Sequence, residues 1–244
     1  MTSPTTAAGP DPRSNHLLAA LPADELDRLR PLLTPVDLDF KHLLYEANAP
    51  IDQVYFPTSG VLSQVAVLDG EAAIEINTIG REGMAGIPAF LGAATSASRV
   101  FCQIPGHGLR LAVADLHRHL SNDGPLHRVL NRYTQVTLVT LARGVACNRL
   151  HTTEERMSRW LLMTRDRVDD DTFPLTQVFL GTMLGVRRAT VSLSAALLQQ
   201  AQLITYTRGQ ITILDRAGLE ATTCECYQAV RDEHTRLISD PNSG

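Results

Sequence analysis

Three arginines lie within residues 174–214, and this stretch contains no aspartate or glutamate. Arg187 and Arg188 are adjacent in the run LGVRRATVS, and Arg208 precedes a glycine near the end of the stretch. Affinity for DNA comes largely from neutralised phosphates, and arginine is the usual bidentate reader of a guanine edge. The clustered positive charge therefore predicts contact with DNA.

Two short helices and a β-hairpin are expected to position these arginines. Apolar residues between Leu175 and Leu184, Val178 among them, have the spacing of a short helix with one buried stripe. Gly185 interrupts the pattern, and a second helix is expected from Arg187 through Leu198. β-Branched residues flank Arg208-Gly209 on both sides, which predicts a hairpin. Helix, turn, helix and hairpin form a winged helix, whose second helix enters the DNA major groove.

The predicted DNA-binding residues come from both helices and from the hairpin turn. They are Thr176, Gln177, Arg187, Arg188, Thr190, Ser192 and Arg208, with Ser194 as a further hydroxyl group. The same pattern is also compatible with a small helical subdomain that packs on another protein. That alternative stays open from the residue pattern alone.

Residues 174–214 and the preceding run TEERMSRWLL at 153–162 closely resemble the DNA-binding domain of the Crp/Fnr superfamily of bacterial transcription regulators. The resemblance extends more loosely over residues 21–150. It implies that Arg188 reads guanine. Two positions depart from the best-known family pattern, Ala189 in place of a glutamate and Leu193 in place of an arginine. We therefore expect the DNA half-site to differ from the familiar one.

The fold that the resemblance implies is α+β. It has an N-terminal antiparallel β-roll like cyclic-nucleotide-binding domains, a long dimerisation helix and a C-terminal winged helix-turn-helix. The expected boundaries are 1–15 for a flexible tail, 16–122 for the β-roll sensor domain, 123–150 for the dimerisation helix and 151–244 for the DNA-binding domain with a C-terminal helix. Short apolar runs punctuated by glycine and proline between Val36 and Val113 independently predict a sandwich or barrel.

A cyclic nucleotide is not the expected effector. Family members that bind one use a Gly-Glu pair for the ribose and an Arg-Ser pair for the phosphate. Here Gly86-Ile87 and Ala97-Ser98 stand at those places, so both charged groups are missing. A buried phosphate without its guanidinium partner is costly. Charged residues nearby could replace the missing glutamate and arginine only if the alignment with the family motif is shifted. The candidate effector-binding residues are then Arg81, Glu82, Gly86, Ser98 and Arg99.

A long helix is expected from Pro125 to about Arg149. Residues on one side of it recur at alternating three- and four-residue spacing, the pattern of a coiled-coil seam: Leu126, Leu130, Tyr133, Thr137, Thr140, Gly144 and Cys147. The resemblance implies a homodimer, a palindromic operator and, for an activator, contact with RNA polymerase. The alternative is that this is the core helix of a monomer.

The four cysteines do not have the pattern of a disulfide framework, which favours a reducing compartment. If Cys224-Glu225-Cys226 lies on a helix, its two thiols point about 200° apart and suit no single tetrahedral site. Further ligands would have to come from Cys102, Cys147 or His234. A redox or metal sensor using Cys224 and Cys226 is therefore an alternative only, and no metal or cofactor is expected.

An enzyme is the competing class of function. His117-Arg118-His119 has the spacing of the metal-binding histidines of cupin-like enzymes, but a helix is expected there and no glutamate follows. We therefore expect no catalytic activity. With 44% hydrophobic residues, 20% charged residues and a net charge of −4, the composition is that of a globular protein. Neither a membrane-spanning run nor a leader stands out, so a cytoplasmic location without membrane contact is expected.

Overall fold

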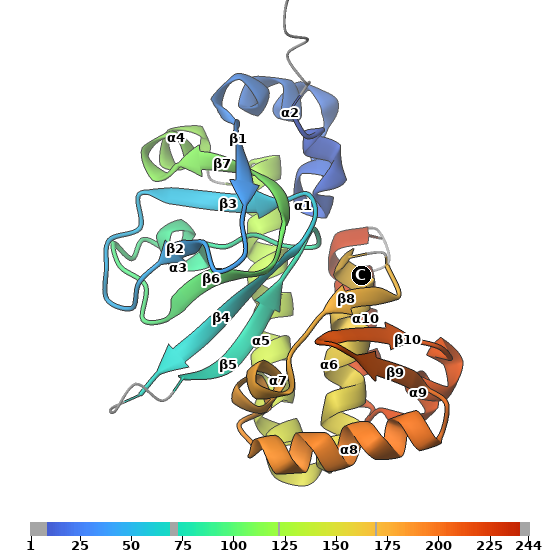
Figure 1. Cartoon of the computed structure of the whole chain (residues 1–244). Helices are drawn as coiled ribbons and strands as arrows, with labels where there is room; N and C mark the ends of the chain where they lie inside the picture. The colour runs from blue at the N-terminus through green and yellow to red at the C-terminus, as the bar shows by residue number, and fades with distance from the viewer. Residues whose placement is uncertain (1–8, 69–72, 122, 169, 240–244) are drawn as a thin grey trace, which may run out of the picture.

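The structure, a computed structural model, describes residues 9–68, 73–121, 123–168 and 170–239. An N-terminal β-roll lies above a C-terminal unit of helices with a small sheet, and one long helix runs past both (Figure 1). This arrangement confirms the α+β fold expected from the sequence.

Short helices precede the β-roll. Their bounds are Pro12–Ser14 for η1, His16–Ala19 for α1, Ala23–Leu29 for α2 and Arg30–Leu32 for η2. Asn15 is completely buried, and its side-chain amide donates to the carbonyl oxygens of Pro57 (2.9 Å) and Gly83 (2.8 Å). Its Oδ1 also caps α1. The expected flexible tail over 1–15 is therefore wrong for residues 12–15, and residues 1–8 lie outside the described part of the chain.

The β-roll consists of two antiparallel sheets. Its strands are β1 Thr34–Leu38, β2 Leu43–Tyr45, β3 Gln53–Pro57, β4 Val61–Val67, β5 Ala73–Ile79, β6 Arg99–Ile104 and β7 Gly106–Ala112. One sheet has the order β1-β7-β3 and the other the order β2-β6-β4-β5. Side chains such as Val54, Phe56 and Leu62 alternate into the space between the sheets and are fully buried there.

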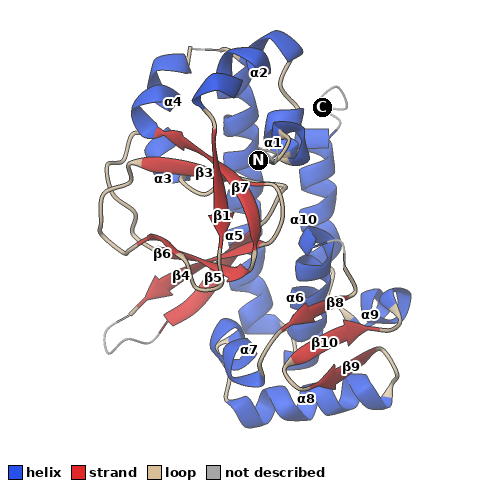
Figure 2. Ribbon diagram, turned by 45° about the horizontal axis from the view of Figure 1, so that its top comes forward, coloured by secondary structure: helices blue, strands red, loops and turns tan. Residues whose placement is uncertain are grey.

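Two short helices, α3 Ile87–Phe90 and α4 Val113–His119, flank the roll, and α5 Pro125–Leu150 follows them. In Figure 2, α5 runs behind the β-roll and continues down to the C-terminal unit. The seam that the sequence predicts on α5 faces the chain itself: Leu126, Leu130 and Tyr133 are all at most 4% exposed. Their partners belong to the same hydrophobic core as the β-roll. The first half of the predicted seam therefore packs within the chain.

Another side of α5 is open. Every position of the series 131, 135, 138, 142, 145 and 149 is exposed, and the series again alternates four- and three-residue steps. Leu138 is 57% exposed and Val145 is 74% exposed. We call this series the open seam of α5.

The C-terminal unit contains the remaining elements. They are α6 Thr153–Val168, β8 Thr172–Pro174, α7 Gln177–Leu184, α8 Arg188–Gln200, β9 Ile204–Thr207, β10 Gln210–Ile213, α9 Arg216–Thr222, α10 Cys226–His234 and the π-helical turn η3 Thr235–Ser239. Its strands form an antiparallel sheet in the order β8-β10-β9. Thr152 and Glu155 form the capping box expected at the start of α6.

The core of the C-terminal unit includes residues of the β-roll. Val61, Val65 and Ile104, from β4 and β6, belong to the same buried cluster as Trp160 and Phe173. Because each is at most 6% exposed, the outer face of the four-stranded sheet is part of this second core. The two units therefore share apolar surface. Among the described residues, no helix is long and apolar enough to cross a membrane.

Candidate nucleic-acid interface

The turn between α7 and α8 is built on two glycines. Gly185 ends α7 with φ 64°, a left-handed conformation that glycine adopts without strain. Gly181 lies where the two helices approach each other, and a Cβ there would be 3.0 Å from the carbonyl oxygen of Val186. Thr176 caps α7 by accepting a hydrogen bond from the amide of Phe179 (3.1 Å). The local sequence thus fixes the angle between the helices.

One face of α8 is buried, and its first turn is open. Val191, Ala195 and Leu198 are at most 2% exposed and anchor the helix to the second core. Arg187, at the N-cap, and Arg188, at the first helical position, are both exposed. The positive end of the helix macrodipole adds to their charge. An anionic surface is therefore best accommodated at the N-terminal end of α8.

Some of the predicted DNA-binding residues are neighbours in the structure. Ser192 Oγ donates to Gln177 Oε1 (2.8 Å), which joins α8 to the start of α7. The hairpin turn lies beside Thr176, because a Cβ on Gly209 would be 3.9 Å from its methyl group. Arg208 is exposed in that turn with φ 52°. Thr190 is exposed on α8.

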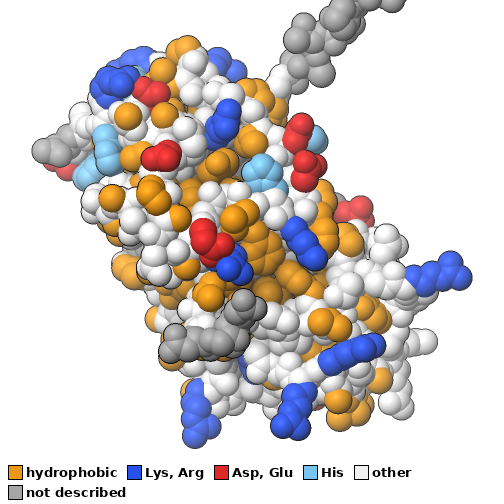
Figure 3. Space-filling view, turned by 60° about the vertical axis from the view of Figure 1, so that its left-hand side comes forward, with side chains coloured by type: hydrophobic (Ala, Val, Ile, Leu, Met, Phe, Trp, Pro, Cys, Tyr) orange, Lys and Arg blue, Asp and Glu red, His pale blue; other side chains and the backbone are white. Residues whose placement is uncertain are grey.

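Basic side chains project from the lower end of the molecule in Figure 3, the end that α8 and the last turns of α5 form in Figure 1. Two expectations for this region are wrong. Ser194 is only 5% exposed and cannot contact DNA, whereas Val178 is 58% exposed rather than buried. Val178 lies one position after the start of α7, so the buried stripe of that helix starts later than its apolar residues suggest.

The candidate effector-binding residues do not come together. Arg81 and Glu82 line a cavity of about 540 Å³ between the β-roll, α5, α6 and α10, whereas Gly86, Ser98 and Arg99 lie outside its lining. Ser98 Oγ accepts from Gln64, and Arg99 pairs with Glu46 (2.8 Å) on the β-roll surface. Gly86 has φ 115°, and a Cβ there would be 2.6 Å from Val54. It therefore has a structural role in the turn before α3.

Glu82 serves as a link between the two units. Its carboxylate accepts from Arg167 Nε of α6 (2.9 Å), and both side chains are largely buried. Arg167 also donates to the carbonyl oxygen of Thr78 (3.2 Å). Burial alone would raise the pKa of Glu82, but the nearby Arg167 and hydrogen bonds outweigh it and lower that pKa. The pair therefore holds α6 against the β-roll.

Glu75 forms a second link between the β-roll and α6, and the protonation state of its carboxyl group depends on pH. Its carboxylate accepts from Trp160 Nε1 of α6 (2.7 Å) and from Ser63 Oγ of β4 (2.6 Å). Burial raises its pKa from 4.5 to about 7, in spite of these two hydrogen bonds. Because the folded state favours the protonated acid, the stability contributed by this group is complete below pH 4.5 and is lost as the pH rises to about 7.

Trp160 is the only tryptophan of the chain, so its fluorescence reports on this link. We expect its emission to titrate with a midpoint near pH 7, the pKa of Glu75. Glu75→Gln is expected to abolish this titration and to remove the accompanying loss of stability, because glutamine keeps an acceptor oxygen without a charge. Glu46→Gln, in an exposed pair, serves as the control and should keep the wild-type profile. An unchanged titration in Glu75→Gln would show that another group is responsible.

The His-X-His pair is not arranged as a cupin metal site. Both histidines lie on α4, as expected. His117 Nε2 lies 2.8 Å from the carbonyl oxygen of Ala89, and His119 Nδ1 lies 2.9 Å from that of Asp115. The two rings therefore engage separate backbone groups, and nothing in their arrangement favours the enzyme alternative.

Comparisons with known proteins agree with this geometry. Residues 155–222 match the model of the Crp-like helix-turn-helix domain. No curated protein matches the sequence significantly.

Solved structures resemble the chain over most of its length. FixK2 from Bradyrhizobium japonicum is 16% identical with a TM-score of 0.63, covering 79% of this chain and 98% of that one. A Crp/Fnr-family transcriptional regulator from Thermus thermophilus is 18% identical with a TM-score of 0.64, covering 78% and 97%. The c-di-GMP responsive global regulator CLP of Xanthomonas campestris is 14% identical with a TM-score of 0.65, covering 80% and 100%. At these identities the likeness establishes a common fold.

Proposed function

We propose that this chain, which has a Crp-like helix-turn-helix domain and shares the fold of Crp/Fnr regulators, regulates transcription by binding double-stranded DNA. The observation that carries this proposal is the open first turn of α8. Arg187 and Arg188 are both exposed there, on a helix whose opposite face is anchored in the core. A recognition helix needs this combination, because its N-terminal residues contact base edges in the major groove.

The second part of the proposal is that the chain binds DNA as a homodimer. The open seam of α5 supports this, because it exposes apolar side chains at coiled-coil spacing along a helix of 26 residues. A two-fold axis along this seam relates two copies of α8. Recognition helices spaced about 34 Å apart read half-sites one helical turn apart, so the proposed operator is palindromic.

The third part concerns the sensor. We propose that the β-roll does not bind cAMP, since Ile87 and Ala97 stand where charged ligand-binding residues are expected and the space between the sheets holds a packed core. One structural neighbour is a regulator described as responsive to c-di-GMP, so this fold accepts effectors other than cAMP. An unidentified small-molecule effector, a cytoplasmic location and RNA polymerase as a partner of an activator complete the proposal. We propose no catalytic role.

Selection of genomic DNA fragments by the full-length protein at fixed salt tests the proposal. The wild type is expected to enrich a palindromic sequence. Arg188→Ala should bind it about 1–3 kcal/mol more weakly and lose base preference at one position in each half-site, because alanine removes a bidentate guanine contact. Arg118→Ala, an exposed arginine on α4, is the matched control and should behave as wild type. Equal affinity and specificity in Arg188→Ala would contradict this docking of α8.

A further inference from the structure

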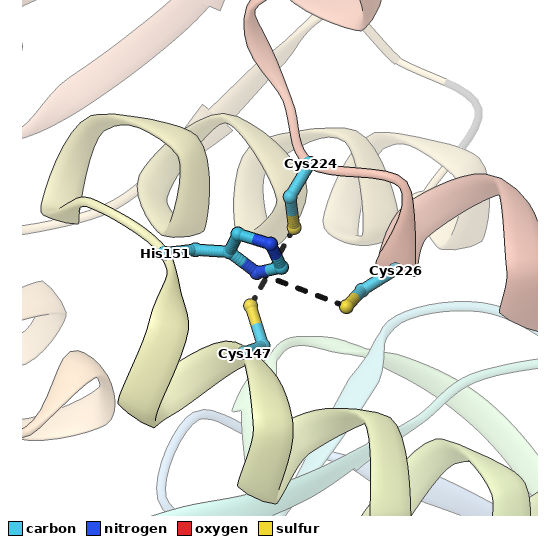
Figure 4. A group of neighbouring side chains, drawn as sticks. All are labelled: Cys147, His151, Cys224 and Cys226. Atoms are coloured by element: carbon cyan, nitrogen blue, oxygen red, sulfur yellow. Dashed lines mark hydrogen bonds between the residues drawn. The ribbon is translucent and has the colours of Figure 1, made fainter.

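Three cysteines and one histidine converge at the lower end of α5. Cys147, His151, Cys224 and Cys226 each offer a ligand atom, and these atoms all lie within 4.8 Å of one another (Figure 4). Cys147 Sγ is 3.5 Å from Cys224 Sγ, and Cys226 Sγ is 3.9 Å from His151 Nδ1. The three cysteines are at most 5% exposed, and the histidine is partly exposed. This cluster lies outside the proposed DNA interface.

The fold brings together residues that are distant in sequence. Cys147 and His151 are four residues apart at the C-terminal end of α5, so they lie on one side of the helix. Cys224 lies in the link between α9 and α10, and Cys226 is the first residue of α10. The expectation of a single helix through Cys224-Glu225-Cys226 is therefore wrong. Because the chain turns between the two helices, both thiols point to the same place, as Figure 4 shows.

The surroundings of the cluster are those of a metal site. His151 Nε2, the ring nitrogen turned away from Cys226, lies 3.3 Å from the carboxylate of Glu225. Metal-binding histidines usually direct their second nitrogen to a carboxylate or carbonyl, which fixes the tautomer and raises ligand basicity. The imidazole is thus oriented with Nδ1 toward the thiols.

Positive charge lies next to the thiols. Arg159 is close enough to interact electrostatically with Cys147 and Cys226. Its buried Nε has no hydrogen-bond partner among the described residues. Three thiolates around a divalent cation carry a net negative charge, which a guanidinium would offset. A cavity of about 250 Å³ lined by Cys147, Arg156 and Arg159 adjoins the site.

We propose that Cys147, His151, Cys224 and Cys226 bind one zinc ion with tetrahedral geometry. Three thiolates and one imidazole form a known closed zinc ligand set, with Zn–S distances of about 2.3 Å and Zn–N distances of about 2.0–2.1 Å. The spacing of the ligand atoms suits a single ion. In an iron–sulfur cluster the cysteines are divided between two or more irons, so thiolates that bind different irons lie farther apart than the ligands of one ion. A disulfide would need an S–S distance of about 2.05 Å, well below the separation of Cys147 and Cys224.

Bound zinc would join the end of α5 to the start of α10, at the boundary between the long helix and the C-terminal unit. α6 begins two residues after His151, and its Arg156 donates to the carbonyl oxygen of Leu184 at the end of α7. Because ligands from distant segments come together only in the folded chain, zinc binding adds directly to the stability of this junction. This inference rests on the four ligands alone and holds whether or not the protein binds DNA.

Metal analysis of the full-length protein tests the site. After chelation and dialysis, we expect the wild type to take up one zinc ion per chain and to unfold at a higher temperature with zinc than without. Cobalt(II) in its place should give the thiolate charge-transfer and intense ligand-field absorption of a tetrahedral site. Cys102→Ser, a buried cysteine on β6 outside the cluster, is the matched control and should retain all three properties.

Cys224→Ser is expected to lose the thermal shift and the charge-transfer intensity of one thiolate. Glu225→Gln leaves the four ligands in place and should weaken zinc binding by about 10–100-fold, the usual effect of removing a carboxylate behind a metal-binding histidine. This milder variant keeps the test valid if Cys224→Ser fails to fold. Iron with acid-labile sulfide, a Cys147–Cys224 disulfide in the protein as isolated, octahedral cobalt absorption or an absence of zinc uptake would each overturn the proposal.

Discussion

The double substitution Leu138→Asp and Val145→Asp is expected to give a folded monomer that no longer binds a palindromic operator tightly. Both side chains lie on the open seam of α5 and are 57% and 74% exposed in the single chain, so the fold does not depend on them. Across a two-fold interface the substitutions place four carboxylates where apolar contacts are proposed, and burying them unpaired is costly. Operator affinity should fall by about 100- to 10,000-fold, the usual advantage of two linked binding modules over one.

Sedimentation equilibrium measures the change in oligomeric state, and circular dichroism shows whether the monomer is folded. Leu150→Asp is the matched control, since Leu150 is also 74% exposed on α5 but lies off the open seam. It should remain a dimer. A dimeric double variant with normal operator binding would place the interface on another surface and would overturn this part of the proposed function.

Phe173→Ala is expected to destabilise the C-terminal unit by about 3–5 kcal/mol, the range for removing a buried aromatic ring. Phe173 is 2% exposed in β8, where it pairs with Ile211 of β10 and packs in the second core. The missing ring leaves a cavity that neighbouring side chains fill only in part. Urea unfolding followed by Trp160 fluorescence reports the loss, because Trp160 belongs to the same core.

Val178→Ala provides the comparison, and it also tests a correction made by the structure. Sequence periodicity places Val178 in a buried stripe, whereas it is 58% exposed at the start of α7. Its substitution should therefore change stability by no more than about 0.5 kcal/mol, as for other surface positions. A loss comparable to that of Phe173→Ala would mean that Val178 is buried after all.

The sequence predicted the elements well where several signals agree. For the helix-turn-helix, apolar periodicity, Gly185 and the adjacent arginines all indicate the same structure, and α7, α8 and the β9–β10 hairpin follow it. Strands β2 to β7 of the β-roll also lie between Val36 and Val113, where short apolar runs predict a sandwich or barrel. Local patterns were sufficient in both regions, because whether a segment forms a helix, a strand or a turn depends largely on its own residues.

The sequence failed where the outcome depends on which surfaces meet. On α5, two different sets of residues have coiled-coil spacing, and periodicity does not tell which set faces the β-roll. The larger side chains of Leu126 and Tyr133 pack within the chain and leave Leu138 exposed. Of two such series on one helix, the more apolar one more often packs within the chain. This difference in apolar character would have distinguished the two series on α5.

The cysteine cluster was missed for a related reason. Cys147 and Cys224 are 77 residues apart, and no local pattern connects them. If Cys224-Glu225-Cys226 were helical, its two thiols would point in different directions. In the structure the chain turns between α9 and α10, and the two thiols come together. Thr223 marks this turn, since it is the C-cap of α9 in an extended conformation. The spacing of Cys147 and His151 by four residues at a helix end was the remaining usable signal.

The core shared by the two units limits how this protein can be divided. Val61, Val65 and Ile104 of the β-roll fill part of the interior of the C-terminal unit. A C-terminal fragment that begins after α5 would lack these side chains, and the apolar residues that they cover would be exposed. Grafting the C-terminal unit onto an unrelated sensor would meet the same difficulty, unless the new sensor supplied a sheet of matching shape. Exchange of parts between such proteins should therefore succeed only when β4 and β6 move together with α7.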